Sequence, residues 1–313
     1  MRPKLPTLWA ALAVWIASAS IAFALEVAVI SDTNGSYGST KYSNRVSQAI
    51  ERIIQIKPDL VIATGDLVAG QRKPLLSQAE VDAMWTSFHR TVSDPLAKAG
   101  IPLAVTPGNH DASAYSGFER ERKIFAAQWS KRRPAVKFLD DKDYPFFYGF
   151  EKEGTLFVSY DATTLGPLSG DQMQRLKAMS KGYKSIVTFS HLPLWPFAQA
   201  REREIIGDTT LDALQREVGV SLHLSGHHHA YYPGWKDGVA YVSQACLGGG
   251  ARKLIGTSGT SEHSFTMLSI DANGNYRVKA LRAPNYTSEI DITTLPQSIK
   301  TPKATLKRLD LAN

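Results

Sequence analysis

The sequence has a single cysteine, Cys246, among 313 residues, so the chain cannot form an internal disulfide. It also has no run of interleaved basic and aromatic residues that would mark a nucleic-acid track, and Lys131 to Arg133 are interpreted as a solvated helix end. Internal repeats and low-complexity segments are missing as well. With 43% hydrophobic and 21% charged residues, the composition excludes a disordered, collagenous or multi-span membrane protein. What is left is a globular chain that depends on an apolar core for its stability.

The one long apolar run lies at the amino terminus. Arg2 and Lys4 precede a stretch from Leu8 to Phe23 that is interrupted only by small residues. This pattern predicts a signal peptide over residues 1–24 with cleavage after Ala24, and an uncleaved membrane anchor is the competing interpretation. Loss of the two cations would lower the net charge from +7 to +5. We therefore expect a periplasmic or secreted protein without a stable membrane span after cleavage.

Hydrophobic patterning predicts an α/β fold. Buried strands are expected at 26–30, 60–63 and 102–105, separated by helices over 42–56 and 77–98. This order implies right-handed parallel crossovers. Further strands are expected at 156–160, 186–189 and 222–224, with helices over 171–179 and 209–217, and strands without helices at 239–243, 265–270 and 276–280. The later strands suggest an antiparallel finish, so we predict one domain over residues 25–283 and a poorly packed tail over 284–313.

A polar residue able to bind metal follows each of the expected parallel strands. These residues are Asp32, Asp66, Asn109 with His110, His191, and His227 with His229. In an open α/β sheet, ligands collect at the carboxyl ends of the strands, so residues far apart in sequence meet there. Carboxylate, amide and imidazole groups together suit Mn, Fe, Zn or Co, and the lack of thiolates argues against a structural zinc site.

Five ordered blocks of sequence contain these residues. They are Ser31-Asp32-Thr33-Asn34, Gly65-Asp66-Leu67-Val68, Gly108-Asn109-His110-Asp111, Ser190-His191-Leu192-Pro193 and Gly226-His227-His228-His229. Together they resemble the five motifs of the calcineurin-like metallophosphoesterases. The resemblance implies a four-layered α/β/β/α sandwich of two mixed sheets, with the catalytic domain over residues 25–283. It also implies two divalent metal ions and hydrolysis of a phosphate mono- or diester by in-line attack of a metal-bound hydroxide.

The resemblance also implies a role for each residue. Asp66 would bridge the two metals, and Asp32 and His229 would hold the first metal. The second metal would be held by Asn109, His191 and His227. His110 would stabilise the transition state or protonate the leaving oxygen, with Asp111 orienting its ring. His228 should point away from the metals, because side chains alternate along an extended segment.

The first block departs from the family pattern, because Asn34 stands where the family has a histidine. Asn34 could offer an amide oxygen to the first metal, leave the position to water, or simply form a tight turn with Gly35, and these interpretations remain open. Part of the chain also resembles purple acid phosphatases, but Ala69 stands where those enzymes have a tyrosine ligand. A tyrosinate-to-iron colour is therefore not expected.

Two rival functions remain beside a phosphoesterase with a small phosphorylated substrate. One is a phosphate- or nucleotide-binding protein of the same fold in which catalysis is impaired, and the other is a nuclease of the superfamily, which the missing basic track disfavours. Four aromatic residues follow the metal-binding blocks, and we expect ordinary packing for them, with a place on the substrate rim as the alternative interpretation: Trp195, Phe197, Tyr231 and Tyr232. Arg252 and Lys253 are either solvated or within reach of a phosphate. Oligomeric state, native metals and ester type do not follow from the sequence.

Overall fold

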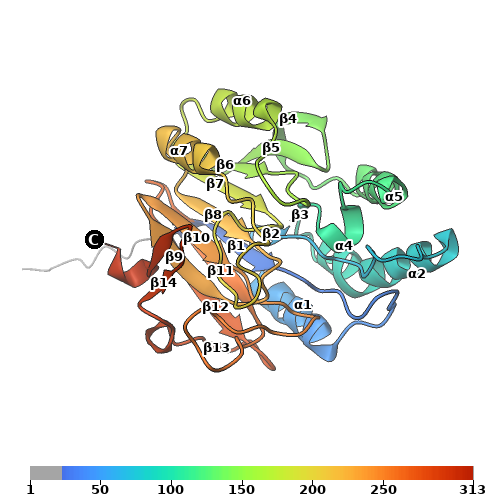
Figure 1. Cartoon of the computed structure of the whole chain (residues 1–313). Helices are drawn as coiled ribbons and strands as arrows, with labels where there is room; N and C mark the ends of the chain where they lie inside the picture. Colours follow the sequence, from blue (N-terminus) through green and yellow to red (C-terminus); the bar gives the residue numbers. More distant parts are fainter. Residues whose placement is uncertain (1–22, 313) are drawn as a thin grey trace, which may run out of the picture.

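The computed structural model describes residues 23–312, which form two mixed β-sheets covered by helices on their outer faces (Figure 1). The strand order is β13-β12-β11-β1-β2-β3 in the six-stranded sheet and β14-β15-β9-β10-β8-β7-β6-β5-β4 in the nine-stranded sheet. The expected α/β/β/α sandwich is confirmed. The signal peptide expected over residues 1–24 lies almost entirely outside the described residues.

The six-stranded sheet has a parallel half and an antiparallel half. The strands β1, β2 and β3 run parallel, β11 pairs with β1 in the antiparallel sense, and β12 and β13 continue that pattern. The strands span Phe23–Ile30 (β1), Leu60–Ala63 (β2), Leu103–Val105 (β3), Ser264–Asp271 (β11), Tyr276–Arg282 (β12) and Ser288–Glu289 (β13). The crossover helices span Asn44–Ile56 (α1), Gln78–Phe88 (α2), His89–Ser93 (the π-helix η1) and Asp94–Lys98 (α3).

The nine-stranded sheet is built around the parallel strands β6, β7, β8 and β10. Its strands span Lys137–Asp143 (β4), Phe147–Lys152 (β5), Thr155–Ser159 (β6), Ser185–Ser190 (β7), Leu222–Ser225 (β8), Tyr232–Lys236 (β9), Val239–Ser243 (β10), Ser298–Lys300 (β14) and Thr305–Arg308 (β15). The remaining helices are Asn109–Ala112 (α4), Glu119–Ser130 (α5), Gly170–Met179 (α6), Thr209–Glu217 (α7), Ile292–Thr294 (η2) and Leu309–Leu311 (η3).

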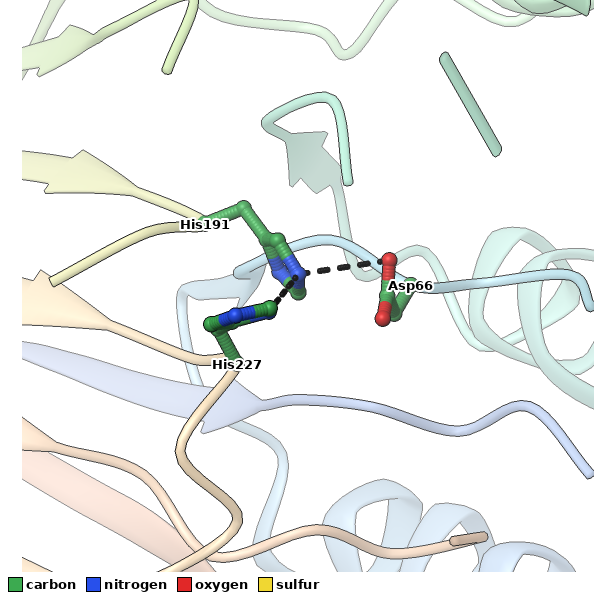
Figure 2. Close-up of side chains that lie close together, drawn as sticks. All are labelled: Asp66, His191 and His227. Carbon is green, nitrogen blue, oxygen red and sulfur yellow. Dashed lines mark hydrogen bonds and ion pairs between the residues drawn. The ribbon is translucent and has the colours of Figure 1, made fainter. Parts of the chain in front are cut away.

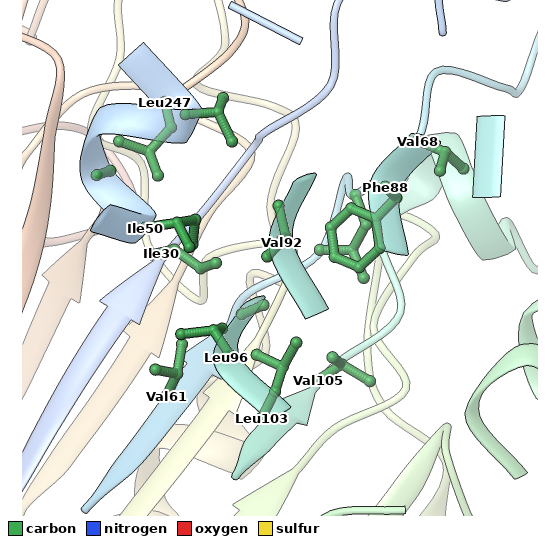
Figure 3. Packing of buried hydrophobic residues seen from close by; sticks show 14 of the residues in the cluster. Ile30, Ile50, Val61, Val68, Phe88, Val92, Leu96, Leu103, Val105 and Leu247 are labelled. Carbon is green, nitrogen blue, oxygen red and sulfur yellow. The ribbon is translucent and has the colours of Figure 1, made fainter. Parts of the chain in front are cut away.

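Alternating side chains of β1 separate the layers of the core. Val27 and Val29 point between the two sheets, where they join the apolar cluster that contains Phe189 of β7. Ile30 faces the opposite way and packs with Ile50 of α1 under the helices (Figure 3). Because successive side chains of a strand point to opposite faces, β1 is apolar on both sides, as a strand buried in the middle of a layered fold must be.

Two expectations about the later part of the chain are wrong. The strand β10 is not purely antiparallel, since it pairs in the parallel sense with β8 and in the antiparallel sense with β9. The segment after residue 283 is not poorly packed either. It contributes β13 to one sheet and β14 and β15 to the other, and the side chains of Ile299 and Leu306 are fully buried.

Within residues 23–312, no helix combines the length and the apolar character that a membrane crossing requires. The strand β1 begins at Phe23, two residues before the expected start of the mature chain at Leu25. Leu25 is itself buried and pairs with Ile270 of β11. Cleavage after Ala24 would therefore leave the inner part of β1 intact.

Candidate metal centre and active site

The candidate ligands lie where the parallel strands of both sheets end. Asp32 and Asp66 follow β1 and β2, and α4 begins at Asn109 after β3. On the other sheet, His191 follows β7 and His227 follows β8. The carboxyl ends of parallel strands meet at one edge of each sheet, so the layered packing brings these residues into one crevice.

Four of the candidate ligands hold a backbone conformation that non-glycine residues rarely adopt. The φ angle is 47° at Asp32, 54° at Asp66, 63° at His227 and 50° at His229. Such left-handed conformations cost of the order of 1–3 kcal/mol each and persist where the surrounding structure requires them. Here they turn the chain sharply at the strand ends, and this brings the side chains toward a common centre.

The first group of donors contains residues that were expected to hold the second metal. It consists of Asp66, His191 and His227, whose side chains point toward one another (Figure 2). The Nε2 atom of His191 lies 3.3 Å from Oδ1 of Asp66 and 3.2 Å from Nδ1 of His227. It also lies 2.9 Å from Oδ1 of Asn109. The carboxylate oxygen of Asp66, the amide oxygen of Asn109 and one ring nitrogen from each histidine thus surround one point.

The outer nitrogens of the two rings fix which atoms face that point. Nδ1 of His191 donates to the carbonyl oxygen of Thr64 at 2.9 Å, and Nε2 of His227 donates to Oε2 of Glu204 at 2.9 Å. In the neutral rings, the inner nitrogens therefore present lone pairs to each other. Only a cation or an added proton satisfies this arrangement, and an outer N–H bound to a carbonyl or carboxylate is the usual support of a metal-binding histidine.

The second group of donors consists of Asp32, Asp66 and His229. Nδ1 of His229 donates to the carbonyl oxygen of Gly250, which leaves Nε2 facing Oδ1 of Asp32 at 2.9 Å. This Oδ1 atom is buried and has no hydrogen-bond partner of adequate geometry among the described residues. The other oxygen of Asp32 accepts hydrogen bonds from Oγ of Ser31 and from the backbone N–H of His227. One oxygen of Asp32 is therefore positioned by the protein, and the other remains for a cation.

The pKa shifts show how strongly this cluster favours positive charge. Burial alone would lower the pKa of His191, but the neighbouring Asp66 carboxylate raises it to about 9. Burial would also lower the pKa of His229, but the charge of the Asp32 carboxylate and its hydrogen bond to the ring raise this pKa well above its ordinary value. Burial opposes ionisation of Asp66, yet His191 and His110 hold its pKa below the ordinary value. Buried carboxylates in such a cluster need compensating cations, and divalent metals fit the donors present.

Asn109 is oriented by a residue that the sequence did not reveal. Its Nδ2 donates to Oε1 of Gln71, and Nε2 of Gln71 donates in turn to Oγ of Ser113 at 3.2 Å. Because the amide nitrogen is engaged by Gln71, the amide oxygen of Asn109 faces His191. Gln71 therefore fixes which end of the Asn109 amide is available as a ligand.

The expected role of Asp111 is wrong. Its Oδ1 and Oδ2 accept the backbone N–H groups of Gly108 and Leu67 at 2.6 and 2.7 Å. The ring of His110 is instead oriented by Nδ1, which donates to the carbonyl oxygen of Gly70 at 2.7 Å. Burial and the nearby Asp66 raise the pKa of Asp111 to about 7. Asp111 thus holds together the two turns that carry Asp66 and Asn109.

A cavity of about 510 Å³ opens over the cluster. Its wall includes His110, Arg201, Glu204 and Arg252, together with four of the candidate ligands: Asp66, Asn109, His227 and His229. Four aromatic side chains that follow the metal-binding blocks are buried and do not line the cavity, which confirms ordinary packing over a place on the substrate rim: Trp195, Phe197, Tyr231 and Tyr232. Arg252 does line it, with Nη1 donating to the carbonyl oxygen of His227, whereas Lys253 is exposed elsewhere.

The sequence profile of the calcineurin-like phosphoesterases matches residues 25–231. The chain belongs to this family. It is therefore a metal-dependent hydrolase of phosphoric esters, and the family uses a dinuclear metal centre, which fits the two donor groups. Among proteins of curated function, no sequence matches.

Solved structures resemble this phosphoesterase in fold. A dimetal phosphatase from Danio rerio superposes with a TM-score of 0.59 at 14% identity, over 86% of this chain and 98% of that one. GAP50, described as the anchor in the inner membrane complex of Plasmodium, gives a TM-score of 0.53 at 13% identity, over 91% of this chain and 88% of that one. At these identities the likeness concerns the fold alone.

Two further residues of the family motifs, Asn34 and His228, have different positions relative to the cavity. Asn34 lines the cavity, and its Nδ2 lies 3.4 Å from the carbonyl oxygen of Val68, so ligation of a metal by its amide oxygen stays a prediction. His228 points away from the donors as expected. Its Nδ1 accepts the backbone N–H of Phe197 at 3.1 Å, and its Nε2 donates to the carbonyl oxygen of Glu204 at 3.0 Å.

Proposed function

We propose that this phosphoesterase is exported and hydrolyses small phosphate mono- or diesters in the cavity above the donor cluster. The observation that carries the proposal is the pairing of anchored histidines with buried carboxylates. His191, His227 and His229 each donate one N–H to a fixed acceptor and turn the other nitrogen toward Asp32 or Asp66. The rivals, an impaired phosphate-binding protein and a nuclease, become outcomes of the experiment below.

The protein would hold two divalent cations with residues of both groups. Asp66 belongs to both donor groups, which suits a shared ligand, and Asp32, Asn109, His191, His227 and His229 would complete them. When bound, such metals neutralise the phosphoryl oxygens and activate a water molecule as the nucleophile. The donor set fits Mn, Fe, Zn or Co.

The chain's own contribution to proton transfer would come from His110. Its ring is 42% exposed at the cavity wall, and Nε2 lies 4.0 Å from Oδ2 of Asp66. Because Nδ1 is fixed on the carbonyl oxygen of Gly70, the proton available for transfer is the one on Nε2. This atom can hold a proton for the leaving oxygen of an ester bound over the cluster.

Arg252 would add positive charge for the phosphoryl group. Its guanidinium is fixed by the carbonyl oxygen of His227, and its backbone N–H donates to the carbonyl oxygen of His229 at 3.2 Å. The side chain is therefore held beside the donor cluster rather than left free in solvent. A guanidinium has further N–H groups to offer to an anionic ligand.

Export rests on the N-terminal pattern of Arg2, Lys4 and the apolar run that ends near Ala24. Sequencing the amino terminus of the full-length protein from a bacterial host tests it. A chain that starts at Leu25 in the envelope fraction is expected, and an uncleaved chain in the membrane fraction would favour an anchor.

The test of the reaction is hydrolysis of p-nitrophenyl phosphate and of its bis-ester by manganese-loaded protein from Leu25 onward. Activity should disappear in Asp66→Ala, and kcat should fall about 10²- to 10⁴-fold in His110→Ala if this residue acts as a general acid. The preferred ester assigns the mono- or diester class. Hydrolysis of neither ester with any of several metals, together with phosphate binding, would indicate the impaired binder, and cleavage of plasmid DNA would indicate a nuclease.

A further inference from the structure

Two large apolar side chains remain exposed at the mouth of the cavity. Tyr115 is 44% and Leu165 is 51% exposed, and both line the cavity. Within residues 23–312, only three other large hydrophobic side chains are comparably exposed: Leu75, Leu139 and Leu311. A single exposed apolar residue needs no explanation, but two that share one functional cavity indicate a binding surface.

The two residues belong to segments that are joined by hydrogen bonds. The backbone N–H of Leu165 donates to the hydroxyl oxygen of Tyr115 at 3.2 Å, and that of Ala114 donates to Oγ1 of Thr163 at 2.9 Å. The N–H of Tyr115 donates to Oγ of Ser113 at 3.2 Å. The exposed ring of Tyr115 is thus fixed at both its backbone and its hydroxyl, so it forms a prearranged surface.

The same segment connects to the metal ligands. Ser113 accepts a hydrogen bond from Nε2 of Gln71, and Gln71 accepts one from the amide of Asn109. Tyr115 therefore lies three hydrogen-bonded steps from a candidate ligand. A phosphoryl group over the cluster would have its ester oxygen within the same cavity that Tyr115 and Leu165 line.

The cavity has a charged part and an apolar part. The charged part contains Arg201 and Arg252, which suit phosphoryl oxygens. It also contains Glu204, whose carboxylate is paired with Arg201 and His227, and three of the candidate ligands: Asp66, His227 and His229. Tyr115 and Leu165 have no charge to offer a phosphate, but the ring of Tyr115 offers a π-face and Leu165 an aliphatic surface. This division fits a substrate with an anionic end and a flat apolar end.

We propose that Tyr115 and Leu165 form a platform for the leaving group, and that the substrate is a phosphate ester of an alcohol with an aromatic ring. The inference rests on the proposed phosphoesterase function and adds the substrate class. The platform would bind the group that leaves, and it contains none of the candidate metal ligands.

Binding of two non-hydrolysable phosphonates to the manganese-loaded protein tests the platform independently of turnover. Calorimetry should show phenylphosphonate bound about tenfold more tightly than methylphosphonate, because the ring adds apolar contact. The variants Tyr115→Ala and Leu165→Ala should each lose most of this preference and keep the affinity for methylphosphonate. Tyr115→Phe, which retains the ring, should keep the preference.

Leu139→Ala is the matched control, since Leu139 is comparably exposed on β4 and does not line the cavity. It should change neither affinity. Equal binding of the two phosphonates by the unmodified protein, or equal loss of both in a folded Tyr115→Ala, would overturn the platform even if p-nitrophenyl phosphate is hydrolysed. If neither phosphonate binds and neither ester is hydrolysed, the proposed function fails as well.

Discussion

Each histidine of the donor cluster is controlled by the acceptor on the far side of its ring. His191 and His229 use the backbone carbonyls of Thr64 and Gly250, but His227 uses the carboxylate of Glu204. The hydrogen bond from His227, with Arg201 nearby, lowers the pKa of Glu204 to about 2. Glu204 is thus a charged anchor that can make the inner nitrogen of His227 a better donor.

Replacing Glu204 should weaken metal binding and spare the fold. Glu204→Ala removes the acceptor that fixes the His227 ring, and we expect manganese affinity to fall about 10- to 100-fold. Glu204→Gln retains an acceptor oxygen and should recover part of this loss. The measurement is a manganese titration of metal-depleted protein followed by calorimetry.

Glu202→Ala provides the control, because Glu202 is exposed on the same loop and, among the described residues, accepts a hydrogen bond only from the backbone N–H of Ala200. Equal affinities for Glu204→Ala and Glu202→Ala would show that the anchor has no influence on the metal. Activity of Glu204→Ala that stays low at saturating manganese would place Glu204 in the reaction itself.

At the residue scale, the sequence predicts the metal ligands better than the residues that orient them by hydrogen bonds. The predicted ligands follow strand ends within compact motifs, so their positions can be read from local pattern. Gln71 and Glu204 act on residues that lie 38 and 23 positions away in the chain. Asp111 shows the converse, since its place beside His110 suggested contact with that ring, whereas it binds backbone N–H groups of Leu67 and Gly108.

At the scale of elements, the neighbouring strands β7 and β8 are joined by a buried histidine that should make the protein sensitive to acid. His223 receives a hydrogen bond at Nδ1 from Thr188 at 2.8 Å and donates from Nε2 to Ser190 at 3.1 Å. Burial lowers its pKa from 6.5 to about 3. The folded state therefore excludes a proton that the unfolded chain binds below pH 6.5.

The stability lost through His223 should grow as the pH falls from 6.5 toward 3. Over that window the unfolded state binds more protons, so the free energy of unfolding rises with pH, by about 2 kcal/mol between pH 5 and pH 7 for this group alone. Urea unfolding of the protein and of His223→Gln at pH 7 and pH 5 isolates the effect. The variant should lose about 2 kcal/mol less on acidification, and identical pH dependence would contradict the assignment.

The C-terminal strands should contribute to stability as core elements. Leu306 of β15 is fully buried in the cluster that also contains Leu211 of α7. Leu306→Ala should lower the free energy of unfolding by about 2–5 kcal/mol. Leu311→Ala, at a site that is 39% exposed, should change it by less than about 0.5 kcal/mol. Equal unfolding curves for the two variants would show that β15 is a dispensable tail.

The elements that the sequence predicts are those with strong apolar patterns. The strand β2 and the helix α7 have the expected bounds, and the expected helix over residues 77–98 is divided among α2, η1 and α3. The missed strand β9 contains Pro233 and Gly234, which are uncommon inside strands. The strands β14 and β15 are short and lie at the edge of the sheet, where β15 pairs with β9 and β14 pairs with β15, so their pairing rather than their sequence pattern defines them.

At the scale of the whole molecule, two sheets are required to build one site. Asp32, Asp66 and Asn109 follow strands of the six-stranded sheet, and His191 and His227 follow strands of the nine-stranded sheet. The apolar layer between the sheets therefore fixes the distance between carboxylates and imidazoles. Local patterns do not encode the packing of one sheet on another, and the resemblance to a family supplied that part of the prediction.

The central claim is that the two donor groups, which share Asp66, hold two metal ions. The most direct measurement is the manganese content per chain after chelator treatment, reloading and removal of free metal, with Asp66→Ala in parallel. We expect two ions per chain in the unmodified protein and less than one in folded Asp66→Ala. No bound manganese in the unmodified protein, or two ions regardless of Asp66, would contradict the account.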